Sequence, residues 1–229
     1  MIMNKAVILL SGGLDSVVSL ASRVKEIDFQ LALLFDYGQK SFHKEFVAAQ
    51  NIADFYGIKL DVVKLDFLKN ITSTTLVSED DVPEVSTLQL DNSSITIDSM
   101  KSVWVPNRNG LFIHIAAAYA DSFNYDYIVI GANKEEANTF SDNSKDFINS
   151  INESLKTSTN YNVQVLAPLI DCTKDEIVKI ALDCDAPLNL INSCYGAQTG
   201  HCGKCESCNR LKRALQNSDC DRIIMELFG

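Results

Sequence analysis

The stretch Lys5–Ser16, KAVILLSGGLDS, decides the fold class of this 229-residue chain. Its first half, Lys5–Leu10, is a continuous apolar run, which is typical of a strand buried on both faces of a parallel sheet. Two glycines follow, and Asp15–Lys25 then carries apolar residues at helical spacing. The sequence therefore predicts a buried strand, a tight turn and a helix in direct succession.

The turn between them, Leu10–Ser16, has the composition of a phosphate-binding loop. A helix N-terminus presents unpaired N–H groups and partial positive charge, and glycines let the backbone approach an anion closely. Ser11 and Ser16 add hydroxyl donors, whereas Asp15 would repel a bare phosphate and suits Mg²⁺. The loop lacks the Gly-Lys-Ser/Thr ending of a Walker A loop and the glycine spacing of a dinucleotide fingerprint. The simpler alternative is a tight turn with an Asp/Ser helix cap.

Strand-like and helix-like segments alternate along the rest of the chain, which predicts a five-stranded, doubly wound parallel α/β sheet. The predicted strands are Lys5–Leu10, Gln30–Asp36, Lys59–Leu65, Tyr127–Gly131 and Asn162–Ala167. The predicted helices are Asp15–Lys25, Phe42–Tyr56, Gly110–Phe123, Ser144–Thr157, Thr173–Asp183, Arg210–Gln216 and Arg222–Leu227. The segment Asp66–Val103 interrupts this rhythm; a loop of this length is either functional or mobile, or a tolerated surface insertion.

The overall composition excludes several classes of protein. Hydrophobic residues make up 46% and charged residues 22%, as in ordinary globular proteins. A formal charge of −10 and a pI of about 4.7 argue against a constitutive binder of nucleic acid or of anionic membranes. The apolar run Ala6–Leu10 is too short for a signal peptide or a transmembrane helix. We therefore expect a cytoplasmic protein, in which cysteines stay reduced.

Four of the seven cysteines, Cys194, Cys202, Cys205 and Cys208, lie within fifteen residues. Four thiolates on a short loop suit a tetrahedral, structural Zn²⁺ site with no open coordination position. An iron–sulfur cluster and unligated cysteines are the alternatives. Cys172, Cys184 and Cys220 are expected to be buried packing residues. We expect a zinc-binding lobe, 191–229, packed on an α/β domain, 1–190, as one structural unit.

The SGGLDS loop at the first strand–helix junction resembles that of the N-type ATP pyrophosphatase (PP-loop) superfamily, whose members cleave ATP between the α and β phosphates. The resemblance implies an adenine nucleotide alpha-hydrolase-like, Rossmann-like fold and ATP binding by the loop. It also implies that the adenine lies near Leu34 and Phe35 and that Lys174 contacts phosphate. On this basis Leu10, Ser11, Gly12, Gly13, Leu14, Asp15 and Ser16 bind ATP, and Asp15, Ser16 and Lys174 are catalytic.

Further motifs resemble the 7-cyano-7-deazaguanine synthase family, which serves queuosine and archaeosine biosynthesis. They are SGGLDS (Ser11–Ser16), FDYGQ (Phe35–Gln39), VPNRN (Val105–Asn109), GAN (Gly131–Asn133), TFSDNS (Thr139–Ser144) and the block Cys194–Cys208. The resemblance implies that 7-carboxy-7-deazaguanine and ammonia are converted to the nitrile with ATP, in a homodimer. The alternatives are a paralogue that delivers the activated carboxylate to another amine, such as a protein terminus, a different PP-loop amidotransferase, and a nucleotide-binding regulatory module without turnover.

The resemblance also implies substrate-binding residues, namely Gln39, Arg108, Asn133 and Asp142. Arg108 is expected to be catalytic as well and to clamp the substrate carboxylate or the phosphates, because a guanidinium pairs bidentately with either. Asp142 either accepts from the guanine-like N–H edge or is an ordinary turn residue. Glu136 is a weaker candidate.

Overall fold

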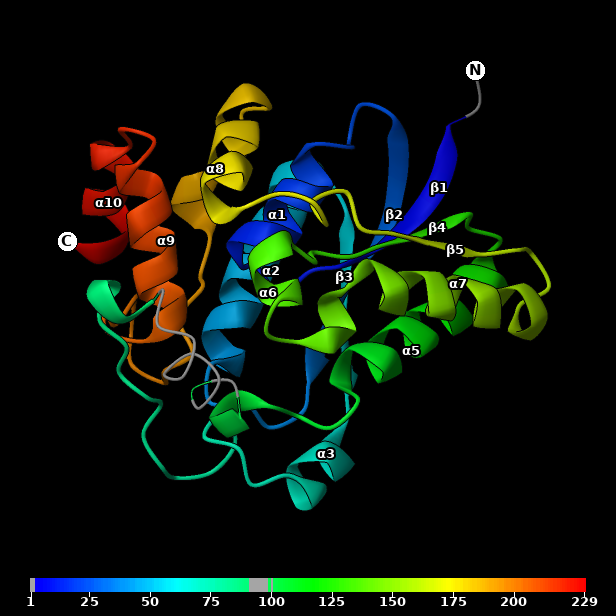
Figure 1. The fold of residues 1–229 in the computed structure, drawn as a ribbon. Helices are drawn as coiled ribbons and strands as arrows, with labels where there is room; N and C mark the ends of the chain where they lie inside the picture. Colours follow the sequence, from blue (N-terminus) through cyan, green and yellow to red (C-terminus); the bar gives the residue numbers. More distant parts are fainter. Residues whose placement is uncertain (1–2, 91–98, 100) are drawn as a thin grey trace.

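A computed structural model of the protein describes residues 3–90, 99 and 101–229. A five-stranded sheet stands at its centre, with helices on both sides (Figure 1). The strands are β1 (Asn4–Leu9), β2 (Ile27–Asp36), β3 (Lys59–Lys64), β4 (Tyr127–Val129) and β5 (Gln164–Leu166). The helices are α1 (Leu14–Ala21), α2 (Phe42–Tyr56), α3 (Asp66–Ile71), α5 (Arg108–Phe123), α6 (Lys134–Ala137), α7 (Lys145–Ser158), α8 (Lys174–Asp183), α9 (Glu206–Gln216) and α10 (Asp221–Phe228), with short 3₁₀ turns η1 (Thr87–Gln89), η2 (Ser141–Asn143) and η3 (Leu188–Leu190).

All pairings between neighbouring strands are parallel, and the strand order is β3-β2-β1-β4-β5. The chain moves outward from β1 to β3 and then crosses back to place β4 on the other side of β1. The connections after β1 and β4 therefore diverge, which opens a crevice at the carboxyl ends of these two strands. The predicted doubly wound parallel α/β fold is confirmed.

Strand β1 is buried on both faces, as its apolar run predicts. Ala6 and Ile8 belong to a core with α1, α2 and α8, whereas Val7 packs into a second core with α5 and α7. Each layer of helices therefore has its own core. The C-terminal helices α9 and α10 lie beyond α8 (Figure 1), and Leu211 and Leu215 of α9 belong to the first core.

Most predicted boundaries agree with the structure to within a few residues. Helix α1 is shorter than predicted, because Ser22 caps it and the following residues form turns closed by the Arg23–Glu26 ion pair. The predicted interruption after Asp66 contains α3 and η1. It also contains an antiparallel bridge between Glu84 and Cys205, so this segment reaches the cysteine block. Asp91-Asn92, part of the same prediction, lies outside the described residues.

Within the described ranges, no helix is both long and apolar enough to cross a membrane.

Candidate active site

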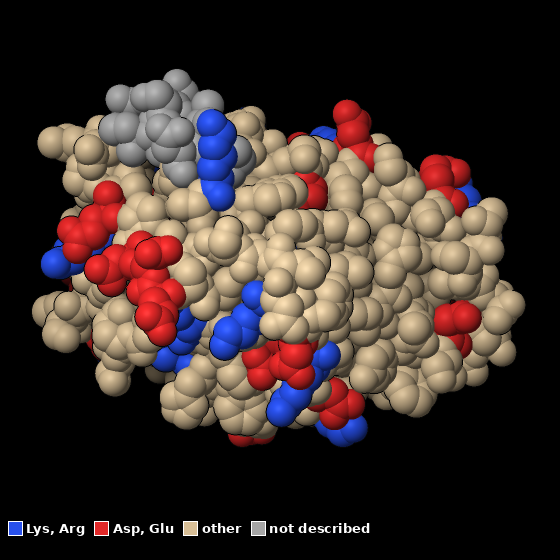
Figure 2. Space-filling model, turned by 90° about the horizontal axis from the view of Figure 1, so that it is seen from below, with Lys and Arg blue, Asp and Glu red and all other residues tan. Residues whose placement is uncertain are grey.

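A cavity of about 260 Å³ lies at the carboxyl ends of the strands. Strands β2 and β3 run downward in Figure 1, so Figure 2 views the side toward which they point. That face consists mostly of uncharged residues, with acidic and basic side chains interspersed (Figure 2). The predicted site residues that line the cavity are Leu10, Ser11, Gly13, Leu14, Asp15, Ser16, Leu34, Phe35, Arg108 and Lys174. The structure thus brings together residues from four separate stretches of chain.

The loop after β1 wraps one side of this cavity. Gly12 has φ +76°, and a Cβ there would lie 2.6 Å from the Cβ of Ala48, so the turn requires glycine. Ser16 donates to the carbonyl of Gly13 at 3.0 Å, and its Oγ lies 3.2 Å from that of Ser11. The N–H groups of Asp15 and Ser16 stand in the first turn of α1, where a helix supplies no internal acceptor. The loop therefore has the geometry of an anion site.

Lys174 lies opposite this loop and is bound by two carboxylates. Its Nζ lies 2.5 Å from Oδ2 of Asp15 and 3.0 Å from Oε1 of Glu136, and its side chain is only 11% exposed. Burial disfavours the charged form of Lys174, but the two carboxylates more than offset this and raise its pKa. Burial also raises the pKa of Asp15, to about 6, against the attraction of Lys174. For Glu136, burial is outweighed by Lys174, and its pKa is lowered.

The backbone around Lys174 is held on two sides. Thr173 and Glu176 form the predicted capping box, which starts α8 directly before Lys174. The N–H of Lys174 donates to Glu135 at 2.7 Å, and the second carboxylate oxygen of Glu135 accepts from Arg210 of α9 at 3.0 Å. These bonds fix the start of α8 relative to both α6 and the C-terminal helices.

The second carboxylate oxygen of Asp15, Oδ1, is available to bind a cation. This oxygen is buried and has no hydrogen-bond partner among the described residues. A buried carboxylate oxygen without a partner is costly unless a ligand satisfies it. Lys174, Asp15 and Glu136 together carry a net charge of −1, which would oppose a polyphosphate. Oxygen ligands suit Mg²⁺, so Asp15 fits the predicted metal.

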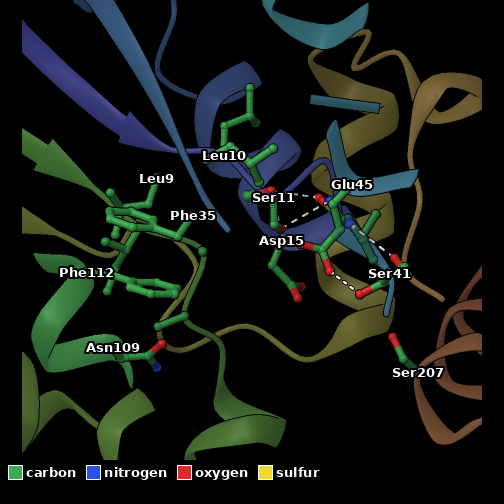
Figure 3. A pocket seen from close by; sticks show the side chains of 18 of the residues that line it. Leu9, Leu10, Ser11, Asp15, Phe35, Ser41, Glu45, Asn109, Phe112 and Ser207 are labelled. Atoms are coloured by element: carbon green, nitrogen blue, oxygen red, sulfur yellow. Dashed lines mark hydrogen bonds between the residues drawn. The ribbon is translucent and has the colours of Figure 1, made fainter. Parts of the chain in front are cut away.

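An apolar wall faces the loop (Figure 3). The rings of Phe35 and Phe112 are stacked at a centroid distance of 4.0 Å with an interplanar angle of 6°. Leu34 also lines the cavity from β2. Such a wall suits one face of a planar aromatic base.

Arg108 reaches the cavity from the start of α5. Its guanidinium donates to the hydroxyl of Tyr37 at 3.1 Å and lies 5.7 Å from the centre of that ring. In the described residues it forms no ion pair, so the charge is available to an anionic ligand. The neighbouring Asn109 donates to the carbonyl of Asp142 at 3.3 Å.

Four predicted ligand-binding residues do not line the cavity: Gly12, Gln39, Asn133 and Asp142. Asn133 is fully buried and caps α6 by accepting from the N–H of Glu136 at 3.0 Å, so it positions the carboxylate that binds Lys174. Gln39 is also buried, and its carboxamide is occupied by protein partners. Asp142 lies beside the cavity, next to the lining residue Asn143.

The four clustered cysteines converge. Their Sγ atoms all lie within 4.8 Å of one another, and those of Cys202 and Cys208 are 3.8 Å apart. A tetrahedral Zn²⁺ with bonds of ~2.3 Å to sulfur would place the sulfurs about 3.8 Å apart. Backbone N–H groups of Gly196 and Cys202 also approach Sγ of Cys194 at 3.4 Å, which stabilises a thiolate. The cluster can therefore hold a metal ion.

Several lining residues were not singled out as ligands from sequence: Tyr37, Ser41, Glu45, Asn109, Phe112, Tyr195 and Ser207. Tyr195 follows the cluster residue Cys194, and Ser207 lies between Cys205 and Cys208. The cysteine block therefore forms part of the cavity wall. Tyr37 and Asn109 fall inside the quoted FDYGQ and VPNRN motifs, which is the signal that could have identified them.

Comparisons with known proteins identify the family of this chain. Residues 5–219 match the family described as queuosine biosynthesis protein QueC. A 7-cyano-7-deazaguanine synthase of Carboxydothermus hydrogenoformans is 51% identical over 213 residues, covering 93% of this chain and 98% of the relative. A protein of the same name from Methanosarcina mazei is 44% identical, covering 98% and 99%. Among solved structures, NMN synthetase from Francisella tularensis aligns with a TM-score of 0.45 and 14% identity, covering 96% of this chain and 86% of that one. On the strength of the family match and these full-length relatives, the chain belongs to the QueC family.

Proposed function

We propose that this chain is an ATP-dependent carbon–nitrogen ligase that converts 7-carboxy-7-deazaguanine and ammonia to 7-cyano-7-deazaguanine. The observation that carries the proposal is full-length similarity to relatives of that name, at up to 51% identity among those reported above. The cavity supports it, because an anion-binding loop and an aromatic wall face the same space.

In the first step, an oxygen of the substrate carboxylate attacks the α-phosphorus of ATP and pyrophosphate leaves, which gives an acyl adenylate. N–H groups of Asp15 and Ser16 and the ammonium of Lys174 stabilise the negative charge that develops on the phosphates. Each such preorganised donor is worth on the order of 3 kcal/mol of barrier. Mg²⁺ held by Asp15 would neutralise phosphate charge when bound.

Ammonia then attacks the acyl carbon and AMP leaves, which yields the amide. A second ATP activates the amide oxygen, and loss of that oxygen with its phosphate group, together with protons from nitrogen, leaves the nitrile. Arg108 clamps the substrate carboxylate or the phosphates, because its guanidinium lines the cavity and, within the described residues, has only the Tyr37 hydroxyl as a hydrogen-bond partner. Leu34 and Phe35 pack against the adenine.

The metal held by Cys194, Cys202, Cys205 and Cys208 is, we propose, one Zn²⁺ per chain. Four sulfur ligands leave no open position, so its role is structural. In this proposal 191–229 is a zinc-binding lobe fastened to the α/β domain 1–190. Reduced thiolate ligands suit a cytoplasmic enzyme. A homodimer is expected from the family resemblance, and the interspersed charges of Figure 2 support small-molecule substrates rather than nucleic acid.

The direct test is to incubate the purified protein with ATP, Mg²⁺, ammonium and 7-carboxy-7-deazaguanine and to measure nitrile and pyrophosphate. We expect both products from the wild type and neither from Lys174→Gln. Lys145→Gln is the matched control, because Lys145 lies on α7 and is 60% exposed in a surface ion pair. Pyrophosphate release without nitrile would contradict the proposed reaction.

A further inference from the structure

A partly buried carboxylate on the far side of the cavity has no role in the mechanism above. Glu45, in the first turn of α2, lines the cavity. Its Oε1 accepts from the hydroxyl of Ser41 at 2.5 Å, and its Oε2 accepts from the amide of Gln39 at 2.9 Å. Figure 3 shows Glu45 and Ser41 on the opposite side of the cavity from the stacked Phe35 and Phe112 rings.

Both N–H donors of the Gln39 carboxamide are used within the protein, one of them to hold this carboxylate. Its Nε2 donates to the carbonyl of Phe35 at 2.9 Å as well as to Glu45, and its Oε1 accepts from the N–H of Tyr37 at 3.0 Å. The side chain is 4% exposed. Gln39 therefore ties the end of β2 to the carboxylate of Glu45 and has no donor left for a ligand.

Glu45 itself has capacity left. A carboxylate offers about four lone-pair sites, and protein donors occupy two of those on Glu45. Three carboxylates line the cavity within the described residues. Asp15 and Glu136 bind Lys174, whereas the donors to Glu45 in the described ranges, Gln39 and Ser41, are both neutral. A ligand with two parallel N–H donors would satisfy it.

We propose that Glu45 reads the N–H edge of the deazaguanine base, accepting from the ring N1–H and the 2-amino group, and that Gln39 is the positioning residue that aims it. This inference rests on the proposed function. It assigns base recognition to Glu45 rather than to Asp142, whose side chain does not line the cavity. Glu45 would then bind the edge of the deazaguanine ring, and the aromatic wall would contact one face of the adenine in the same cavity.

The test compares two ligands on two proteins by calorimetry. One ligand is 7-carboxy-7-deazaguanine, and the other carries hydrogen in place of the 2-amino group. Wild-type protein is expected to bind the first ligand about 10- to 100-fold more tightly, because one hydrogen bond to a carboxylate is lost with the second. In Glu45→Gln a carboxamide N–H₂ faces the 2-amino group, so this ratio falls by about 10-fold or more.

A merely structural role would weaken both ligands alike and leave the ratio unchanged, which would overturn the inference. Ser41→Ala keeps the carboxylate and is expected to retain a preference for the 2-amino ligand. Glu153→Gln, an exposed residue of α7, is the matched control with an unchanged ratio. If Glu45→Gln does not fold, Glu45→Asp decides: its shortened carboxylate is expected to lower the ratio, and an unchanged ratio contradicts the proposal.

The two proposals fail in different ways. A wild-type protein that forms no nitrile contradicts the proposed function, and the inference falls with it. A wild-type protein that forms nitrile, with a ratio that Glu45→Gln does not move, contradicts the assignment of Glu45 alone.

Discussion

Asp15 has two carboxylate oxygens in different surroundings. Oδ2 binds Lys174, whereas Oδ1 is buried and finds no hydrogen-bond partner in the part of the chain that the structure describes. Burial raises the pKa of Asp15 from 3.8 to about 6 against the attraction of Lys174. The folded state therefore binds this proton more tightly than the unfolded chain. It follows that the contribution of Asp15 to the free energy of unfolding falls as the pH rises from 3.8 through about 6.

Asp15→Asn is expected to separate activity from stability. Pyrophosphate release should fall at least about 100-fold, because the Mg²⁺ that would neutralise phosphate charge loses its carboxylate ligand. The melting temperature at pH 7 should not fall, since a buried charge is removed while Lys174 keeps Glu136. In the wild type, kcat/KM should decline below about pH 6, as Asp15 becomes neutral.

Pyrophosphate assays and thermal melts of both proteins check these expectations. Asp54→Asn, an exposed change on α2, is the control. Retained activity in Asp15→Asn, or a clearly lowered melting temperature, would count against this account of the carboxylate.

At the scale of single residues, the phosphate loop and the cysteine block could be found from sequence because their chemistry is local. Six consecutive residues make the loop, and the cysteines lie within fifteen. Glu45 and Gln39 could not be separated in this way. Which of the two faces the cavity depends on how the Gln39 side chain bonds to the backbone of Phe35 and Tyr37, and residue types at a given spacing do not specify such side-chain conformations.

Two elements meet closely behind the phosphate loop. A Cβ on Gly131, just after β4, would lie 2.6 Å from the backbone N of Ser16 and 2.8 Å from the backbone C of Asp15. Backbone atoms cannot rotate away as a side chain can. The end of β4 therefore supports the first turn of α1, whose N–H groups face the cavity.

Gly131→Ala is expected to push this turn away from its place. Overpacking costs about 1–3 kcal/mol, so the melting temperature should fall by several degrees, about 2–4 °C for each kcal/mol. The KM for ATP should rise about 10-fold or more, because the N–H groups lose their alignment. Steady-state kinetics and thermal melts measure the two effects.

Gly57→Ala is the matched control. Gly57 ends α2 with φ +68°, and an added Cβ meets nothing within 4 Å. Its alanine variant is expected to lose stability through backbone strain but to keep the wild-type KM. If Gly131→Ala keeps the wild-type KM too, the support of the loop by β4 is not required.

Most elements could be predicted because their patterns are long. The predicted helix Phe42–Tyr56 is confirmed at both ends, and Gly57 forms its left-handed C-terminal cap. Helix α3 has six residues and η1 has three, which is too few to show a helical period. The sequence pattern therefore does not reveal either element within the segment Asp66–Val103. Its bridge from Glu84 to Cys205 pairs residues far apart in sequence, which local patterns do not reveal.

For the whole molecule, alternation of strands and helices predicted a parallel sheet but not the strand order. The position of β4 beside β1 depends on the crossover through α5, and this placement creates the crevice that holds the site. The C-terminal segment also closes that site, since Tyr195 and Ser207 line the cavity. The segment is thus coupled to the domain through both the core and the cavity wall.

Removal of the metal should therefore affect the molecule as a unit. Cys205 caps α9 and Cys208 lies in its first turn, while Leu211 and Leu215 of the same helix pack in the core that contains Val17. A chelator is expected to release about one zinc ion per chain and to lower the melting temperature by roughly 10 °C or more, because metal binding contributes folding free energy. Differential scanning calorimetry should still show one transition, with equal calorimetric and van't Hoff enthalpies.

Cys172→Ser, outside the cluster, should retain the metal and its response to the chelator. Two separate transitions would mean that the lobe 191–229 unfolds on its own, and iron in the released metal would overturn the assignment of zinc.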